Sequence, residues 1–264
     1  MPDTSSAAAA VRSDRQGPVL LLTLDGPRTR NAIGPQTYAA LTDQITLAQK
    51  DHSLRSIVIC GAEGYFCAGG NINALKQSAS GTLDEATART DQLNAMIRAI
   101  TDCPLPVVAA VEGGATGAGL ALAMACDLIV SAQDARFTLA YVKIGLSPDG
   151  GVTHFLRAAL PRQMVMEMGL LGRPVTAERF AQFGIVCALT PPGKALEAAL
   201  SLAQDLAKGP RISQGRIKLQ INVAAQNDLE TQQTLEATDM NIARFGPEAA
   251  EGLAAFLEKR PANF

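Results

Sequence analysis

The chain contains no tryptophan, and aromatic residues make up only 4% of its 264 residues. It also has no basic excess, because 23 Lys and Arg residues face 25 Asp and Glu residues. Proteins that bind nucleic acids rely on Lys and Arg to neutralise phosphates, and those that bind single strands also stack bases on aromatic rings. The composition therefore argues against a dedicated nucleic-acid binder, and we expect no nucleic-acid partner.

Long apolar runs are missing as well, although 47% of the residues are hydrophobic. A membrane-spanning helix needs about 20 consecutive apolar residues, so we expect no membrane association. The five cysteines are scattered without a C-x-x-C pair, which is typical of reduced, buried thiols in a cytoplasmic protein. Residues 1–16 include Asp3 and no sustained apolar core, and they are predicted to form a flexible tail rather than a secretory signal.

Histidine occurs only twice, as His52 and His154, and no G-x-S-x-G sequence is present. A nucleophilic triad needs a histidine base beside its nucleophile, and a zinc site needs several clustered ligands. Neither pattern is found, so we expect no triad chemistry and no metal site.

Apolar runs alternate with helical patterns over the first two-thirds of the chain. Residues 19–24, 56–60 and 107–111 predict buried strands, and residues 35–50 and 83–101 show helical periodicity. After that, amphipathic helical patterns follow one another at about 194–207, 211–226, 228–243 and 247–259. The sequence thus predicts an α/β core over residues 17–192 and a helical region over residues 193–264.

Two loops of small residues each follow a predicted strand. The first is the stretch from Gly61 to Asn71, and the second is the run Gly113–Gly119. Small residues at a strand-to-helix turn let a ligand touch the backbone, where the first helical amides have no intrahelical partner. Such a turn can bind a phosphate or hold an oxyanion.

A dinucleotide site is the first interpretation of the second loop, because its glycines follow a strand. The spacing G-x-x-x-G-x-G is not the usual fingerprint, however, and the following helical segment is short for an ordinary crossover. An oxyanion hole built from one backbone amide of each loop is the better interpretation.

The residues of both loops carry a resemblance to a known family. The segment FCAGGNI at residues 66–72 and the pattern E-G-x-x-x-G-A-G-L-x-L-A-x-A-C-D within residues 108–127 resemble the two signature segments of the enoyl-CoA hydratase/isomerase (crotonase) superfamily. The resemblance continues through residues 137–151, 164–186 and the C-terminal FLEKRP. It implies an α/β, crotonase-like spiral of β-β-α repeats with C-terminal helices that drive trimerisation, and hence a homotrimer or homohexamer.

The resemblance also implies a site. The amides of Ala68 and Ala118 would hold the thioester oxygen of an acyl-CoA, whose coenzyme A is part of the substrate, so no separate cofactor is implied. Lys259 resembles a lysine that reaches a CoA phosphate, often across a subunit interface. The full set of residues matching CoA-binding stretches is Arg28, Arg30, Ala32, Ala68, Gly69, Gly70, Asn71, Ile72, Tyr141 and Lys259.

The carboxylates distinguish members of the superfamily. Its hydratases use two glutamates as acid and base, and the matching positions here are Ala121 and Tyr141, neither of which has a carboxyl group. The segment IGLSPDGG resembles the one in which isomerases, including those of phenylacetate degradation, carry a single catalytic Asp, which here is Asp149. Without the resemblance, the alternative role for Asp149 is to cap the helix that starts near Gly151.

We therefore expect an isomerase that moves a C=C bond of an acyl-CoA between the β,γ and α,β positions, with Asp149 as acid and base. A hydratase-type lyase, an acyl-CoA dehalogenase and a CoA-ester-binding protein without catalysis are the alternatives. If Asp149 is not the base, Glu112 beside the second loop is the next candidate.

Overall fold

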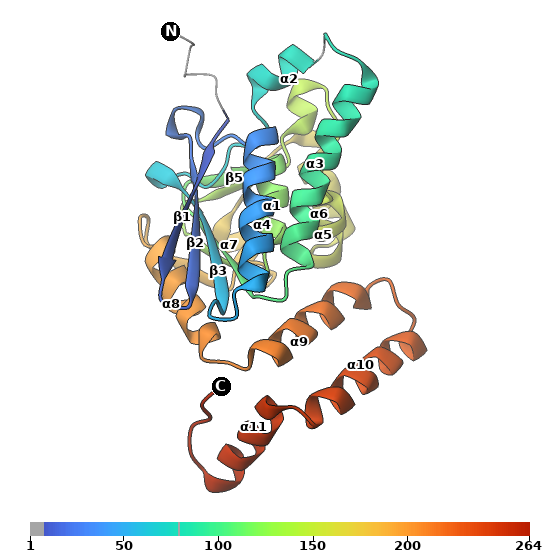
Figure 1. The fold of residues 1–264 in the computed structure, drawn as a ribbon. Helices are drawn as coiled ribbons and strands as arrows, with labels where there is room; N and C mark the ends of the chain where they lie inside the picture. Colours follow the sequence, from blue (N-terminus) through green and yellow to red (C-terminus); the bar gives the residue numbers. More distant parts are fainter. Residues whose placement is uncertain (1–7, 79) are drawn as a thin grey trace.

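A six-stranded sheet lies at the centre of the computed structural model, which describes residues 8–78 and 80–264 (Figure 1). The first two strands pair antiparallel, and every other neighbouring pair is parallel. This arrangement confirms the predicted α/β class. In spatial order the strands are β1 (Ala10–Gln16), β2 (Val19–Asp25), β3 (Ser56–Gly61), β4 (Val107–Val111), β6 (Leu128–Ala132) and β9 (Ala188–Thr190).

Helices cover both faces of this sheet because side chains alternate along each strand. Leu22 and Leu24 of β2 belong to the larger core, which also contains residues of α1 (Pro35–Lys50), α3 (Leu83–Thr101) and α4 (Ala118–Ala125). Val19 and Leu21 of the same strand point to the opposite face, against α8 (Ala195–Ala207). The site described below lies on the side of α1, α3 and α4.

The helix α8 belongs to the core and not to a separate helical region. Its residues Ala195, Ala199 and Ala203 are fully buried in one cluster with Val58 and Val108 of the sheet. The predicted boundary at residue 193 is therefore wrong, because this helix closes the second face of the sheet. The helices α9 (Arg211–Ala224), α10 (Leu229–Arg244) and α11 (Pro247–Glu258) extend away from the core (Figure 1).

The predicted N-terminal tail is also corrected. Its residues 10–16 form β1, which pairs with β2 from Ala10 opposite Asp25 to Gln16 opposite Val19. Most side chains of β1 are exposed, so backbone hydrogen bonds rather than apolar burial hold this strand. Residues 1–7 of the predicted tail lie outside the described residues.

A second sheet of three short strands has its first strand within the second glycine loop. It consists of β5 (Gly114–Thr116), β7 (Arg136–Thr138) and β8 (Pro174–Thr176). The remaining helices are α2 (Ile72–Ser78), α5 (Val152–Ala159), α6 (Arg162–Leu171) and α7 (Ala177–Gln182). Over the described ranges, none of the helices combines the length and the apolar character that crossing a bilayer requires.

Candidate active site

The two glycine loops lie directly against each other. Cys67 of the first loop pairs with Ala115 of β5, and the Cys67 carbonyl accepts a 3.0 Å hydrogen bond from the amide of Thr116. Gly69 has a φ of +96°, and a β-carbon there would lie 2.6 Å from the Thr116 carbonyl oxygen and 3.4 Å from the Ala118 amide nitrogen. Only glycine permits this approach, so the first loop reaches the start of α4.

The amide of Ala118 is available for a ligand. Ala118 is the first residue of α4, and the preceding Gly117 provides no side-chain cap. Within the described chain the Ala118 N–H has no hydrogen-bond partner. A first-turn amide with the positive end of a helix dipole behind it favours a negative oxygen.

The amide of Ala68 is not available, which contradicts its predicted role. It donates a 2.9 Å hydrogen bond to the carbonyl oxygen of Arg30. Gly70 offers an amide instead. It forms a parallel bridge with Ile33 in which the Ile33 amide donates to the Gly69 carbonyl (2.8 Å) and the Asn71 amide donates to the Ile33 carbonyl (3.0 Å). In a parallel pairing of this kind the central residue directs its own N–H away from its partner.

A cavity of 380 Å³ opens beside Gly70. It is lined by the start of α1 with Tyr38, by α2 with Leu75, by α3 with Leu93, and by Asp149. Asp149 is the sole carboxylate among the described residues that line it. A larger hollow of 560 Å³ beside α6, β8 and α7 contains no residue of either glycine loop.

Asp149 is held by a tyrosine. The hydroxyl of Tyr141, in the 3-10 turn η4 (Tyr141–Ile144), donates a 2.6 Å hydrogen bond to Oδ1 of Asp149. Burial, followed by the charge of Asp149, raises the pKa of Tyr141 well above its usual range, so the phenol remains a donor. The helix α5 starts after Gly151 with no side-chain cap, so the Asp149 carboxylate does not serve as its N-cap.

The turn that carries Asp149 is packed closely onto α4 and α3. Gly150 has a φ of +61°, and a β-carbon there would lie 3.1 Å from Cβ of Ala121 and 3.4 Å from Cδ2 of Leu93. Ala121 is fully buried at this contact. A glutamate at position 121 would have to displace the turn, so the packing itself excludes a second carboxylate there.

Tyr38 is a cavity residue that the sequence analysis missed. It lies in the first turn of α1 and is 8% exposed. Burial, followed by the charges of Asp149 and Cys67, raises the pKa of Tyr38 well above its usual range. The chain has only three tyrosines, and Tyr38, Tyr65 and Tyr141 all lie beside the two glycine loops or Asp149. The small number of tyrosines was the feature of the sequence that could have pointed to Tyr38.

Asn31 was also missed, although it connects the predicted CoA loop to the first glycine loop. It is fully buried, and its Oδ1 accepts a hydrogen bond from the Gly26 amide at 2.9 Å. Its Nδ2 donates to the carbonyls of Ala62 (2.9 Å) and Tyr65 (2.6 Å). The guanidinium of Arg30 lies 5.4 Å from the centre of the Tyr65 ring. The loop before α1 is therefore rigidly attached to the site.

The other predicted CoA-binding residues fall into two groups. Arg28 and Arg30 are exposed on the loop that Asn31 fixes, and Ile72 is 58% exposed at the start of α2. Buried Asn71 caps α2, because its Oδ1 accepts from the amides of Asn73 (3.0 Å) and Ala74 (3.1 Å).

Ala32 is buried at the end of the same loop, whereas Lys259 lies just after α11. The carbonyl of Ala32 accepts a 2.7 Å hydrogen bond from the amide of Ala9. Lys259 follows the last residue of α11, which lies at the opposite end of the molecule from α2 (Figure 1). Within one chain the structure does not bring Lys259 to the cavity.

Glu112 does not face the cavity. Its carboxylate accepts hydrogen bonds from the amides of Gly193 (3.0 Å) and Ala195 (2.7 Å) at the start of α8. This contact caps the helix and engages both oxygens, so Glu112 is not a reserve base. Cys67 is not a nucleophile either, because complete burial raises the pKa of its thiol to about 12. Over residues 8–78 and 80–264, no cluster of three His, Cys, Asp or Glu side chains is placed to hold a metal ion.

Comparison with known proteins identifies the family of this site. Residues 14–264 match the sequence profile described as "Enoyl-CoA hydratase/isomerase". The chain belongs to the enoyl-CoA hydratase/isomerase family. This result confirms the resemblance seen in the two glycine segments.

Individual members of the enoyl-CoA hydratase/isomerase family differ in the activity they are named for. The chain is 32% identical over 247 residues to 1,2-epoxyphenylacetyl-CoA isomerase of Escherichia coli K12, covering 93% of this chain and 94% of that protein. It is 32% identical over 251 residues to 2,3-dehydroadipyl-CoA hydratase of the same strain, covering 95% and 96%. Sequence identity alone thus does not separate isomerase from hydratase.

The fold is that of the same family. The structure of an enoyl-CoA hydratase from Polaromonas sp. JS666 superimposes with a TM-score of 0.94 at 37% identity, covering 96% of this chain and 98% of that chain. A putative enoyl-CoA hydratase from Streptomyces coelicolor A3(2) gives a TM-score of 0.92 at 30% identity, covering 100% and 98%. The predicted crotonase fold is confirmed.

Proposed function

We propose that this family member is an enoyl-CoA isomerase that shifts a C=C bond between the β,γ and α,β positions. The observation that carries the proposal is the single carboxylate in the cavity, Asp149, held by Tyr141 at 2.6 Å. A 1,3-proton shift needs one group that removes a proton and returns it. Addition of water needs an acid and a base together.

The amides of Gly70 and Ala118 hold the thioester oxygen in this mechanism. As the α-carbon loses its proton, charge develops on that oxygen, and fixed donors stabilise it by about 3–4 kcal/mol each in well-studied oxyanion holes. The exposed cations Arg28 and Arg30 on the neighbouring loop suit the phosphates of coenzyme A. We retain the prediction that Lys259 binds CoA, with the lysine of one subunit reaching the CoA at the site of a neighbouring subunit.

The proton moves through the free oxygen of Asp149. Because Oδ1 is engaged by Tyr141, Oδ2 removes the α-proton, and the electron pair of that C–H bond moves into the thioester to give a dienolate. The dienolate then takes the proton from Asp149 at its γ-carbon, while the C=C bond forms between the α- and β-carbons. Atoms and charge balance without water or a second acid.

The substitution Asp149→Asn tests this proposal. Asparagine keeps the shape of the side chain and loses its basicity, so conversion of 3-hexenoyl-CoA to 2-hexenoyl-CoA should fall at least ~10³-fold, within the range of general acid–base contributions. Absorbance of the conjugated thioester follows the reaction, and exchange of the α-proton in D₂O follows its first step. Binding of saturated hexanoyl-CoA should persist.

Two results would contradict the proposal. One is an Asp149→Asn protein that isomerises at nearly the wild-type rate. The other is a wild-type protein that hydrates 2-hexenoyl-CoA faster than it isomerises the 3-enoyl thioester, because that reaction would require a second carboxylate from outside the described cavity. A wild-type protein that binds acyl-CoA without α-proton exchange would be a binding protein and not an isomerase.

A further inference from the structure

One hydroxyl group in the cavity has no protein partner. The hydroxyl of Tyr38 forms no hydrogen bond with the described residues, although the side chain is 8% exposed and lines the cavity with Asp149. Among the described residues, no fully buried side-chain nitrogen or oxygen lacks a partner, so this hydroxyl is not sealed in the protein interior. The Tyr38 hydroxyl therefore opens into the cavity, where an occupant can meet it.

The rest of Tyr38 is firmly held. Its ring belongs to the main hydrophobic core, its amide donates to the Gly34 carbonyl at 2.9 Å, and its carbonyl accepts from the Thr42 hydroxyl at 2.8 Å. A phenylalanine would satisfy all of these contacts. The hydroxyl is thus the part of the side chain whose purpose the fold does not explain.

The hydroxyl acts as a donor and not as a base. Burial and the charge of Asp149 both raise the pKa of Tyr38, so its proton stays in place over the range in which enzymes work. Tyr38 and Asp149 line the same cavity, so the phenol borders the space in which the acyl group would react. Asp149 itself takes its hydrogen bond from Tyr141, so the two phenols have different roles.

We propose that Tyr38 determines specificity by donating a hydrogen bond to an oxygen on the acyl group. The substrates are then acyl-CoA thioesters with a keto, ether or hydroxyl oxygen near the reacting carbons, in preference to plain hydrocarbon chains. This inference rests on the proposed function, because it requires the acyl group to occupy this cavity beside Asp149. A site with a fixed donor discriminates against an analogue that leaves the donor unpaired.

Calorimetric binding of saturated thioesters tests the inference without turnover. The probes are hexanoyl-CoA, 4-oxohexanoyl-CoA and 5-oxohexanoyl-CoA, which have no C=C bond to move. We expect the wild type to bind at least one oxo thioester roughly tenfold more tightly than hexanoyl-CoA, which is the size of one net hydrogen bond. The variant Tyr38→Phe should bind hexanoyl-CoA as before and lose the preference. The variant Tyr141→Phe should keep it.

Equal wild-type affinity for all three thioesters overturns the inference, and so does a preference that persists in Tyr38→Phe. If Tyr38→Phe slows isomerisation of 3-hexenoyl-CoA and shifts its pH profile, the hydroxyl acts on Asp149 and not on the acyl group. That result also overturns the inference. The proposed function can fail while the inference stands. If the preference for an oxo thioester is intact but Asp149→Asn isomerises at the full rate, only the role of Asp149 as the base is refuted. Binding of none of the thioesters refutes both.

Discussion

Tyr141 and Asp149 form a hydrogen-bonded pair of 2.6 Å at the cavity, between the hydroxyl of the tyrosine and Oδ1 of the carboxylate. Both side chains are half-buried, and they are eight positions apart in the sequence. The position that corresponds to the second glutamate of hydratases thus carries a group that orients the remaining acid. A short bond from a neutral phenol stabilises the charged carboxylate and restricts its rotation.

The substitution Tyr141→Phe should reduce kcat for 3-enoyl-CoA isomerisation by roughly 10–100-fold with little change in KM, the effect of losing one hydrogen bond to a charged group. Steady-state kinetics with 3-hexenoyl-CoA measures this split between kcat and KM.

The matched control for Tyr141→Phe is Tyr65→Phe. The Tyr65 hydroxyl lies 3.4 Å from the Thr116 hydroxyl and makes no contact with Asp149. Its removal should leave kcat unchanged. If Tyr141→Phe also leaves kcat unchanged, the hydrogen bond has no role in the reaction.

The oxyanion hole can be tested by crowding, since its donors are backbone amides that side-chain truncation cannot remove. The substitution Ala118→Val places two methyl groups beside the α4 amide and should reduce kcat by roughly 10²–10³-fold, as for loss of one oxyanion donor. Circular dichroism and thermal melting should show an intact fold.

The control for crowding is Gly70→Ala. A β-carbon at Gly70 would meet only Cδ1 of Leu75, at 3.5 Å, so a methyl group fits and the amide remains. Turnover should stay close to that of the wild type, because the amide donor of the oxyanion hole is kept. If Ala118→Val retains full turnover, the Ala118 amide has no part in the mechanism.

The long elements were predictable from sequence because local signals determine them, whereas Asp149 was expected from the family resemblance. The helix Leu83–Thr101 starts at a capping box between Thr82 and Glu85 and ends before Pro104, and both signals can be read from the sequence. The strand β1 gave no such signal, because its residues are polar and their pairing with β2 is a tertiary contact.

The correct amide of the first loop was not predictable for a similar reason. Ala68 and Gly70 are both small residues in the same segment, and only the pairing of Gly70 with Ile33 decides which N–H is free. That pairing joins positions almost forty residues apart in the chain. Likewise, the exclusion of a glutamate at Ala121 depends on its contact with Gly150, which belongs to another segment.

A buried ion pair attaches α9 to the core and provides a stability prediction. The Lys218 ammonium lies 2.8 Å from Oδ2 of Asp127 and donates to the carbonyls of Ile100 (2.9 Å) and Leu105 (3.2 Å). The lysine side chain is 8% exposed. The substitution Lys218→Met leaves the carboxylate without its cation and should destabilise the fold by about 3 kcal/mol, measured as a lower urea midpoint.

The pH dependence of that loss has a definite sign. Burial already raises the pKa of Asp127 against the opposing effect of Lys218, and removing the lysine raises it further. A carboxyl with a raised pKa in the folded state favours folding while it is protonated, and that contribution is lost as pH rises through the raised pKa. Lys218→Met should therefore be closest to the wild type in acid. Lys208→Met, at an exposed pair with Asp205, should leave the midpoint unchanged.

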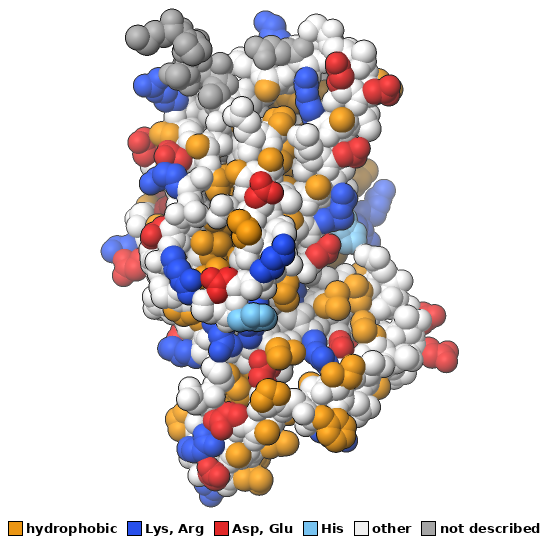
Figure 2. Space-filling model, viewed as in Figure 1, with side chains coloured by type: hydrophobic (Ala, Val, Ile, Leu, Met, Phe, Trp, Pro, Cys, Tyr) orange, Lys and Arg blue, Asp and Glu red, His pale blue; other side chains and the backbone are white. Residues whose placement is uncertain are grey.

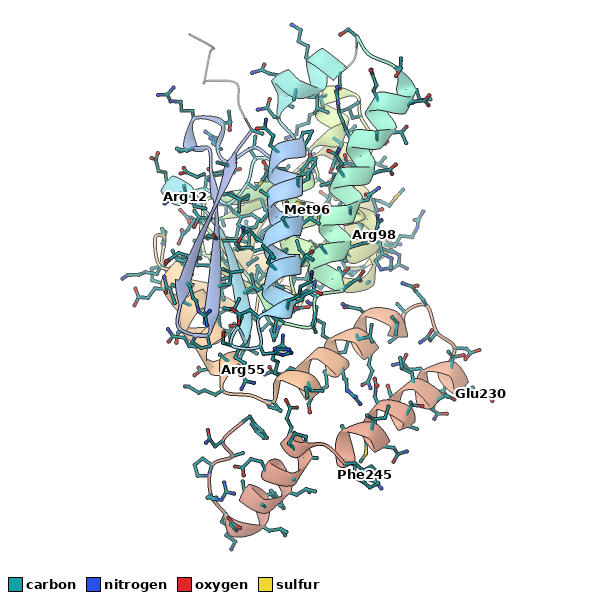
Figure 3. All side chains as sticks on the ribbon, viewed as in Figure 1. Arg12, Arg55, Met96, Arg98, Glu230 and Phe245 are labelled. Atoms are coloured by element: carbon teal, nitrogen blue, oxygen red, sulfur yellow. The ribbon has the colours of Figure 1, made fainter. Side chains whose placement is uncertain are left out.

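The last prediction concerns assembly through the C-terminal helices. Hydrophobic side chains are spread over the surface of these helices (Figure 2), and Phe245, at the end of α10, extends away from the core (Figure 3). Phe245, Phe256 and Leu257 are 88%, 80% and 79% exposed in the single chain. So much apolar surface is typical of a subunit interface, so light scattering should show an oligomer at micromolar concentration. Phe256→Glu should shift the mass toward the monomer, whereas Leu47→Glu on α1 should not. A wild-type monomer would contradict the prediction and, with it, any role for Lys259 of a neighbouring subunit in binding CoA.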